Sequence, residues 1–295
     1  MNVVETSALG KRYGSTWALR DCTLAIPEGH LVALVGPNGA GKTTLLNILV
    51  GLTVPTAGHV TVLDGIPIGS PAALDGIAFV AQDSPLYRQY SVADLLHLTR
   101  NLNNEFDGAL ASKRLRDLGI DEKHKAGKLS GGQQAQLALT LALARHPRLL
   151  VLDEPTASLD PIARHDFMAG VMTAMAEEGL SVLLSSHGLA ELERVADYLV
   201  LLTRGEVRLD GTVDDLAARH RLVTGPAGQA PDPGWRVIQA SQAGAQEHLL
   251  VRLDGTTRPE ASGWDARTVG VEELALAYLR ETPNPRNLAP VEVGR

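Results

Sequence analysis

The sequence predicts an α/β protein built around a sheet of buried parallel strands. The apolar run Leu31-Val-Ala-Leu-Val35 leads into a glycine-rich loop, and the helical pattern of residues 42–50 follows that loop at once. A second apolar run, residues 149–152, ends in two adjacent carboxylates, Asp153 and Glu154. Such continuous apolar runs are typical of strands buried on both faces, and here they alternate with helical segments.

Three shorter strands are predicted around the strand–loop–helix unit. Residues 3–9 and 21–26 have strand composition and end in turns, with Tyr13 placed in the first of these turns. Residues 59–63 form the third strand and are followed by the tight turn Asp64-Gly65. We expect these segments to form an antiparallel β subdomain.

An inserted helical subdomain is predicted at about residues 83–135. Residues 91–118 contain two amphipathic helical patterns separated by Asn101 to Asn104, and they interrupt the α/β alternation. The remaining segments are predicted as strands at 77–81, 181–186, 198–202 and 206–209, and as helices at 135–144, 161–178, 189–196 and 213–220.

The composition changes after about residue 222, where prolines become frequent and apolar runs shorten. Residues 236–240 and 248–253 are predicted strands. One apolar helical stripe follows, made of Val271, Leu274, Ala275 and Tyr278. We therefore divide the chain into a main domain at 1–221, a small α+β appendage at 222–282 and a disordered tail at 283–295.

The loop Gly36-Pro-Asn-Gly-Ala-Gly-Lys-Thr-Thr44 fits the phosphate-binding pattern G-x-x-x-x-G-K-[ST]. Its glycines allow successive N–H groups to curl around phosphates. Lys42 brings a positive charge to the outer phosphates, the Thr43 hydroxyl can bind Mg²⁺, and the following helix points its positive end at the anion. The alternative is a glycine-rich turn with a chance lysine. The predicted nucleotide contacts are Gly36, Pro37, Asn38, Gly39, Ala40, Gly41, Lys42, Thr43 and Thr44.

The two carboxylates after residues 149–152 are expected to have different roles, because adjacent strand residues face opposite ways. Asp153 suits Mg²⁺, usually through water, and Glu154 suits a water molecule held against the γ-phosphate. The alternative is a pair of surface acids at the start of a loop.

The segment Leu129-Ser-Gly-Gly-Gln133 precedes an apolar helix. Ser130 can cap this helix, while Gly131 and Gly132 leave its first N–H groups open. The segment is therefore either a second anion-binding helix start or a simple helix cap.

Three single residues have two interpretations each. Tyr13 is a tyrosine packed at a strand end or a ring stacked on adenine, and the residue chemistry alone favours packing. Gln82, which follows residues 77–81, is a loop glutamine or a ligand-contacting group at the sheet edge. His187, which follows residues 181–186, is structural or catalytic.

The overall composition excludes several classes of protein. The net charge of −7 and the pI of about 5.7 give no overall electrostatic footprint for nucleic acid, which leaves a local basic patch as the alternative. The single Cys22 excludes an internal disulfide and a cysteine-based zinc cluster. The first residues lack the charged and apolar regions of a signal peptide, and no apolar stretch is long enough to span a membrane.

Taken together, these motifs resemble the nucleotide-binding domain of ABC transporters over residues 1 to about 220. Gly36–Thr44 matches the Walker A motif, Leu149–Glu154 the Walker B motif, and Leu129–Gln133 the LSGGQ signature. Gln82 matches the Q-loop, and Ser158–Asp160 the D-loop. The resemblance further matches Tyr13 to the adenine-stacking aromatic and His187 to the switch histidine.

The resemblance implies roles for these residues and names ATP and Mg²⁺ as cofactors. Glu154, His187 and Gln82 are implied in catalysis, and Thr43, Gln82 and Asp153 in arranging Mg²⁺. The remaining implied nucleotide contacts are Tyr13, Ser130, Gly131, Gly132, Gln133 and Asp160. Two departures from the family pattern, at Ala135-Gln136 and at Ala157-Ser158, remove no phosphate-contacting group.

The resemblance also implies partners. These are a second copy of the chain or a homologous ATPase subunit, joined head to tail, and an integral membrane permease. It places the chain in the cytoplasm, on the inner face of the membrane, and is closest to subunits that serve separate export-type permeases. A soluble ABC ATPase acting on nucleic acid or ribosomes is the alternative. A third reading, an ATP-binding regulatory module without hydrolysis, is disfavoured by Glu154 and His187.

Overall fold

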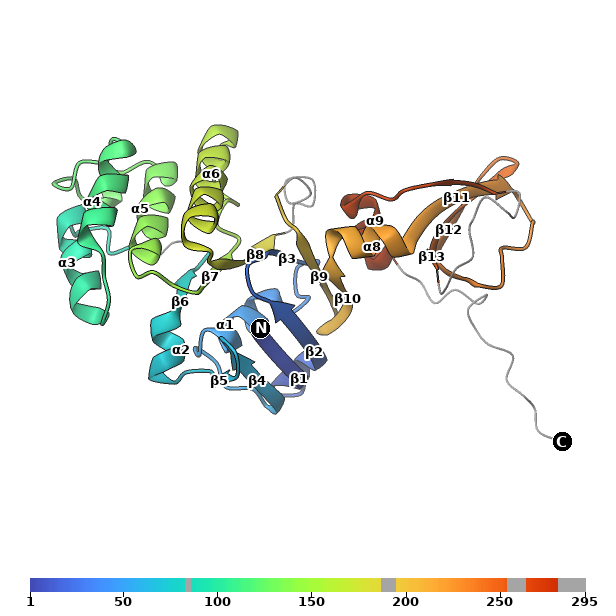
Figure 1. The fold of residues 1–295 in the computed structure, drawn as a ribbon, viewed down its shortest axis with the longest axis horizontal. Helices are drawn as coiled ribbons and strands as arrows, with labels where there is room; N and C mark the ends of the chain where they lie inside the picture. Colours follow the sequence, from blue (N-terminus) through green and yellow to red (C-terminus); the bar gives the residue numbers. More distant parts are fainter. Residues whose placement is uncertain (83–85, 187–194, 254–263, 281–295) are drawn as a thin grey trace. The chain divides into compact units, whose positions relative to one another are not determined.

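The computed structural model describes residues 1–82, 86–186, 195–253 and 264–280 (Figure 1). The chain forms two compact units, Met1–His187 with Leu202–Val207, and Gly188–Leu201 with Arg208–Arg295. Strands β9 (Tyr198–Thr203) and β10 (Glu206–Thr212) contribute residues to both units. His187, most of the predicted helix at 189–196 and the predicted tail at 283–295 lie outside the described residues.

A parallel sheet lies at the centre of the first unit and confirms the predicted α/β class. Its strands there follow the order β3 (Leu31–Val35), β8 (Ser181–Ser186), β7 (Leu149–Asp153) and β6 (Ile77–Val80). Every residue of β3 and β7 is buried, as expected for strands covered on both faces. The carboxyl ends of parallel strands meet at one edge, which is where this class of sheet binds ligands.

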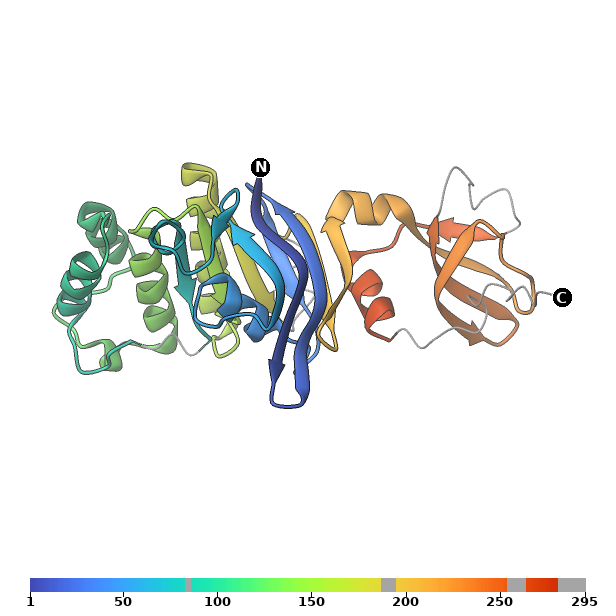
Figure 2. The same ribbon diagram turned by 90° about the horizontal axis from the view of Figure 1, so that it is seen from below.

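The antiparallel sheet follows the order β2 (Thr16–Pro27), β1 (Asn2–Tyr13), β4 (Ala57–Val62) and β5 (Ile66–Pro67). Figure 2 shows β1 and β2 as two long neighbouring strands. They are longer than the strands predicted at 3–9 and 21–26, and Tyr13 belongs to β1 rather than to a turn. The reason is that Gly14, with a φ of 58°, closes a short loop, so pairing continues as far as Tyr13 and Thr16.

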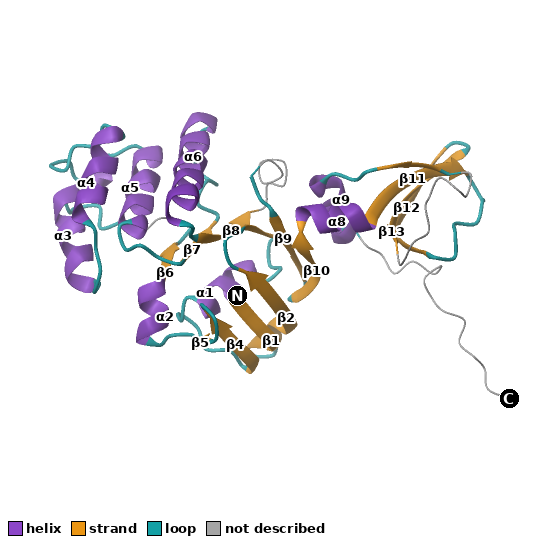
Figure 3. Ribbon diagram, in the orientation of Figure 1, coloured by secondary structure: helices purple, strands orange, loops and turns teal. Residues whose placement is uncertain are grey.

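Helices fill the remainder of the first unit. They are α1 (Lys42–Leu49), α2 (Pro71–Gly76), α3 (Val92–Leu102), α4 (Gly108–Asp117), α5 (Gly131–Leu143) and α6 (Pro161–Glu178), with a 3₁₀ turn at Ala126–Lys128. Helices α3 to α6 are visible in purple in Figure 3. The interior between α3, α4 and α5 is apolar and includes Val92, Leu115 and Leu137. The two helices predicted between residues 91 and 118 are therefore present as α3 and α4.

In its described residues, the second unit contains a small antiparallel sheet and the helices α8 (Val213–Arg219) and α9 (Val271–Leu279). The sheet order is β12 (Trp235–Ala243), β13 (Gln246–Leu253), β11 (His220–Pro226) and β14 (Asp265–Arg267). Trp235 and Trp264 pack edge to face in its core, with ring centroids 6.1 Å apart. The strands and the helix predicted after residue 235 are present. The domain boundary predicted after Arg221 falls within β11, and the division into domains stays a prediction.

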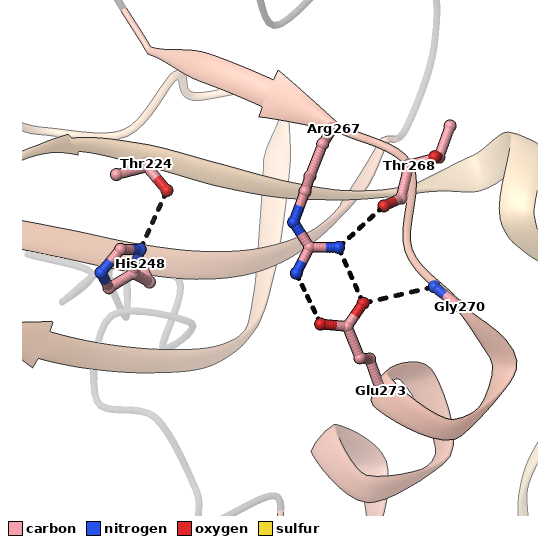
Figure 4. A network of polar contacts seen from close by, with 6 residues as sticks. All are labelled: Thr224, His248, Arg267, Thr268, Gly270 and Glu273. Atoms are coloured by element: carbon pink, nitrogen blue, oxygen red, sulfur yellow. Dashed lines mark hydrogen bonds and ion pairs between the residues drawn. The ribbon is translucent and has the colours of Figure 1, made fainter. Parts of the chain in front are cut away.

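Polar contacts join the end of β14 to the start of α9 (Figure 4). The Arg267 guanidinium donates to both carboxylate oxygens of Glu273, at 2.8 and 2.5 Å. This arginine holds the pKa of Glu273 below its usual value. Nearby, Thr224 and His248 are hydrogen bonded at 2.9 Å across β11 and β13. The exposed Arg267–Glu273 contact orients α9 relative to β14 without adding much stability.

Candidate nucleotide-binding site

The phosphate-binding loop lies between the end of β3 and the start of α1, as predicted. Gly39 and Gly41 have φ angles of 78° and 106°, a region that favours glycine. At Gly36 an added Cβ would lie 2.1 Å from the Leu202 carbonyl oxygen, and at Gly41 it would lie 2.5 Å from that of Ala18. Each of these glycines is therefore required by its backbone angle, by close packing or by both.

Lys42 begins α1 and turns back over the loop. Its ammonium group donates to the Gly36 carbonyl at 2.8 Å and lies 3.7 Å from a carboxylate oxygen of Glu154. The side chain is only 6% exposed. A positive charge thus lies inside the loop, between the amides that would bind phosphates and the carboxylate at the end of β7.

The acidic pair is held by Ser185, which the sequence analysis did not single out. Asp153 and Ser185 occupy paired positions of β7 and β8, and the Ser185 hydroxyl donates to the Asp153 carboxylate at 2.6 Å. The same hydroxyl accepts the backbone N–H of Glu154 at 2.9 Å. Glu154 has a φ of 47°, a left-handed conformation that costs about 1–2 kcal/mol outside glycine. Ser185 therefore fixes both the Asp153 carboxylate and the strained backbone that turns Glu154.

A cleft of about 910 Å³ connects most of the predicted nucleotide contacts. Its lining includes Tyr13 from the end of β1, Gln82 after β6, and Glu154 after β7. The rest of the lining is Ala18, Asn38, Gly39, Ala40, Gly41, Lys42, Thr43, Thr44 and Ala157. Tyr13 is 53% exposed, so its ring is available to a planar ligand. Tyr13 and Gln82 thus both line the cleft, and their contact with a ligand stays a prediction.

The predicted signature and D-loop residues lie in a different place. Ser130, Gly132, Gln133 and Asp160 line a second hollow of about 360 Å³, which shares no residue with the cleft. Ser130 and Gln133 form a reciprocal capping box at the start of α5. Asp160 caps α6, accepting the N–H groups of Ile162 and Ala163 at 3.0 Å each. The cap at Ser130 does not exclude phosphate binding at this helix start. The N–H groups of Gly131 and Gly132 remain open there for a phosphate.

The cleft fits a magnesium ion that is bound mainly through phosphates. No cluster of three or more His, Cys, Asp or Glu side chains that could hold a metal occurs within the described residues. Mg²⁺ commonly uses one or two protein oxygens together with substrate phosphates and waters. Thr43 and Gln82 line the cleft, while Asp153 is only 3% exposed and is not among the lining residues.

The local pattern of β8 carries a signal for a buried hydroxyl at Ser185, although it does not name the partner of that hydroxyl. Ser181-Val-Leu-Leu-Ser-Ser186 has serines at both ends of a buried strand, and Ser185 is one of them. Buried hydroxyls need partners. In a parallel sheet the partner is the residue at the same register of the next strand, which here is Asp153.

These features define a class of protein, the P-loop NTPases: a parallel sheet, a phosphate-binding loop at its carboxyl edge, and an adjacent acidic pair. Comparisons with known proteins identify the family. A family model described as ABC transporter matches residues 19–157. The Nod factor export ATP-binding protein I of Rhizobium sp. (strain N33) is 33% identical over 305 residues, covering 98% of this chain and 95% of that protein. The chain belongs to the ATP-binding proteins of ABC transporters, and it is an ATPase.

Two further comparisons agree with this assignment. The aliphatic sulfonates import ATP-binding protein SsuB of Pectobacterium atrosepticum is 38% identical over 217 residues, covering 72% of this chain and 79% of that protein. A dimeric structure of an ATP-binding cassette in a post-hydrolysis state, bound to ADP and Pi, has a TM-score of 0.63 and 27% identity. It covers 71% of this chain and 98% of that one.

Proposed function

We propose that this chain drives a separate membrane permease by closing a head-to-tail dimer around ATP. The partner in the dimer is a second copy of the chain or a homologous subunit. The observation that carries this proposal is the separation of the predicted ATP contacts into the cleft and the second hollow. A second subunit, turned to face the first, would bring its Ser130 helix start to the γ-phosphate held in the cleft. ATP would then favour the closed dimer and shift the population toward it.

The side chains in and near the cleft have the chemistry needed to bind ATP and Mg²⁺ and to activate water. Lys42 and the loop amides hold the phosphates, and Tyr13 stacks on the adenine ring. Thr43, Gln82 and Asp153 would hold Mg²⁺, which neutralises phosphate charge when bound. Glu154 accepts a proton from, or orients, the attacking water. His187, which lies outside the described residues, is proposed from the sequence to hold the γ-phosphate in line.

A permease requires a docking surface, and the first unit offers an apolar groove of about 440 Å³. Leu52, Phe79 and Leu141 lie in its lining, and so does Ala81, the residue before Gln82. Gln82 lines the nucleotide cleft, so adjacent residues contact the groove and the cleft. We propose that the permease docks here, which places the chain on the inner face of the membrane. Within the described part of the chain, no helix is long and apolar enough to cross a membrane.

The direction of transport is proposed to be export. The relative whose name states export aligns with 98% of this chain, which takes in residues of the second unit. The relative whose name states import aligns with 72%. Purification of the tagged chain from membranes tests the partner. We expect a multispanning membrane protein to accompany it, and nucleic acid in its place would contradict the proposal.

The decisive experiment for the ATPase cycle compares the native chain with Glu154→Gln in Mg²⁺-ATP. A general base typically contributes about 10²–10⁴ in rate. We expect Glu154→Gln to bind ATP, to lose turnover by that order and to accumulate dimers, as measured by phosphate release and light scattering. Glu177→Gln, an exposed change near the end of α6, is the matched control and should behave like the native chain. Near-native turnover of Glu154→Gln would remove Glu154 from this role.

A further inference from the structure

The ring of Tyr13 has little packing of its own. It is the last residue of β1, and residues 12–16 around it are exposed. A half-exposed ring at the end of a hairpin has several rotamers available, and ordering it on a ligand costs conformational entropy. If this ring is to bind a base tightly, another part of the chain must hold it in place.

Lys11 makes that contact. Its ammonium nitrogen lies 5.1 Å from the centroid of the Tyr13 ring, within the range of a cation–π interaction. The same nitrogen donates to the Val54 carbonyl oxygen at 2.7 Å. Val54 lies in the segment between α1 and β4, so the lysine is anchored to backbone that follows the C-terminal end of α1. Lys11 is not among the residues that line the nucleotide cleft, whereas Tyr13 is.

A second cation–aromatic pair in the same hairpin has no such relation to the cleft. The Arg12 guanidinium lies 5.6 Å from the centroid of the Trp17 ring. Arg12 and Trp17 are cross-strand partners of β1 and β2, and neither lines the cleft. The two pairs share their chemistry and their place in the fold, and they differ in whether the ring lines the cleft.

We propose that Lys11 is a positioning residue for the base of the nucleotide. Anchored by the Val54 carbonyl, its ammonium group holds one face of the Tyr13 ring and leaves the other for stacking. Lys11 acts through Tyr13 and does not contact the phosphates. The inference rests on the proposed stacking of Tyr13 on adenine. It adds that Lys11 holds the Tyr13 ring in the orientation that stacking needs.

The test compares Lys11→Met with Arg12→Met in the full-length chain, using isothermal titration calorimetry with ATP. Each variant removes one positive charge and one cation–π pair from the same hairpin, so long-range charge effects are matched. We expect Lys11→Met to raise the Kd for ATP about two- to fivefold, the range of an exposed cation–π contact. Arg12→Met should leave the Kd unchanged, and Lys11→Arg should restore most of the affinity. The kcat at saturating ATP should stay native in all three.

Two further measurements separate this role from a general effect of charge. Inorganic tripolyphosphate has no base, so its Kd should be the same for the native chain and Lys11→Met. In a Tyr13→Leu background, Lys11→Met should no longer change the Kd for ATP. An equal loss of tripolyphosphate binding, or an undiminished effect without Tyr13, would overturn the proposal, and so would a native Kd for Lys11→Met.

The same measurements show whether a negative result refutes the stacking of Tyr13 on the base or only the role of Lys11. If Tyr13→Leu binds ATP as tightly as the native chain, Tyr13 does not stack on the base, and the role of Lys11 falls with it. If Tyr13→Leu weakens binding while Lys11→Met does not, stacking holds and only the role of Lys11 is refuted. Lys11→Gln serves in place of Lys11→Met should circular dichroism show that the methionine variant is not folded.

Discussion

At the scale of single residues, the site depends on a hydroxyl group that does not line the cleft. Ser185 is fully buried, and it links the Asp153 carboxylate to the backbone of Glu154. Groups that orient a metal-binding carboxylate typically change metal affinity or activity ten- to hundredfold when removed. Asp153 and Glu154 are therefore positioned by a residue of β8, a strand that contributes neither carboxylate.

We predict that Ser185→Ala raises the Mg²⁺ concentration needed for half-maximal ATPase activity by roughly tenfold or more. The variant leaves the Asp153 carboxylate without its buried donor and should also lower the free energy of unfolding by about 1–3 kcal/mol. Ser181→Ala is the control, because Ser181 lies in the same strand and its buried hydroxyl accepts the N–H of Gly29 at 2.9 Å. It should lose stability without changing the Mg²⁺ dependence. An equal Mg²⁺ shift in both variants would show a general effect of β8 packing.

At the scale of elements, a buried histidine links helices α8 and α9 of the second unit. His220, 1% exposed, begins β11 and is hydrogen bonded to the Leu216 carbonyl of α8 at 2.7 Å. Its other ring nitrogen lies 2.8 Å from the Tyr278 hydroxyl of α9. Burial lowers the pKa of His220 below its ordinary value, and the nearby Arg252, Arg219 and Arg221 lower it further. The folded unit therefore favours the neutral ring.

This burial predicts that the second unit loses stability in acid. The unfolded chain takes up a proton at His220 near pH 6.5, while the folded chain resists protonation until a lower pH. The contribution is therefore complete above about pH 6.5 and is lost as the pH falls toward the folded pKa. Denaturant unfolding between pH 7.5 and 5 should show this decline, and His220→Gln should show less of it.

Tryptophan fluorescence can report this transition, because two of the three tryptophans, Trp235 and Trp264, lie in the core of the second unit. Trp17→Phe in both proteins would confine the signal to that unit. The pKa of Asp210 is raised, mainly by burial, and this acts in the opposite direction in acid. The relevant quantity is thus the difference between native and His220→Gln profiles. Parallel profiles would rule out His220 as the source.

At the scale of the whole molecule, the separation of the cleft from the second hollow makes a prediction about subunits. In a head-to-tail dimer, each composite site takes Lys42 from one subunit and Ser130 from the other. Lys42→Ala and Ser130→Glu should each abolish turnover alone, the first by removing phosphate binding and the second by placing a negative charge beside the γ-phosphate. Mixing the two inactive chains creates mixed dimers in which one of the two sites is intact.

We therefore expect ATPase activity to reappear on mixing, measured as phosphate release against each variant alone. A mixture of Lys42→Ala with the double variant Lys42→Ala/Ser130→Glu is the control and should stay inactive, because no native loop is present. No recovery in the first mixture would mean that Lys42 and Ser130 act within one subunit, which contradicts the head-to-tail arrangement.

The sequence by itself determined the features whose chemistry lies in consecutive residues. The loop from Gly36 to Thr44, the strand that ends in Asp153 and Glu154, and the capped helix start at Ser130 could be predicted because their backbone angles, hydrophobicity and hydrogen bonding are local. Only the tertiary structure decided which distant residues meet. Ser185 lies 32 residues from Asp153, and Val54 lies 43 residues from Lys11. No local pattern encodes such pairs, since sheet register and loop packing emerge only when strands far apart in the chain are brought together.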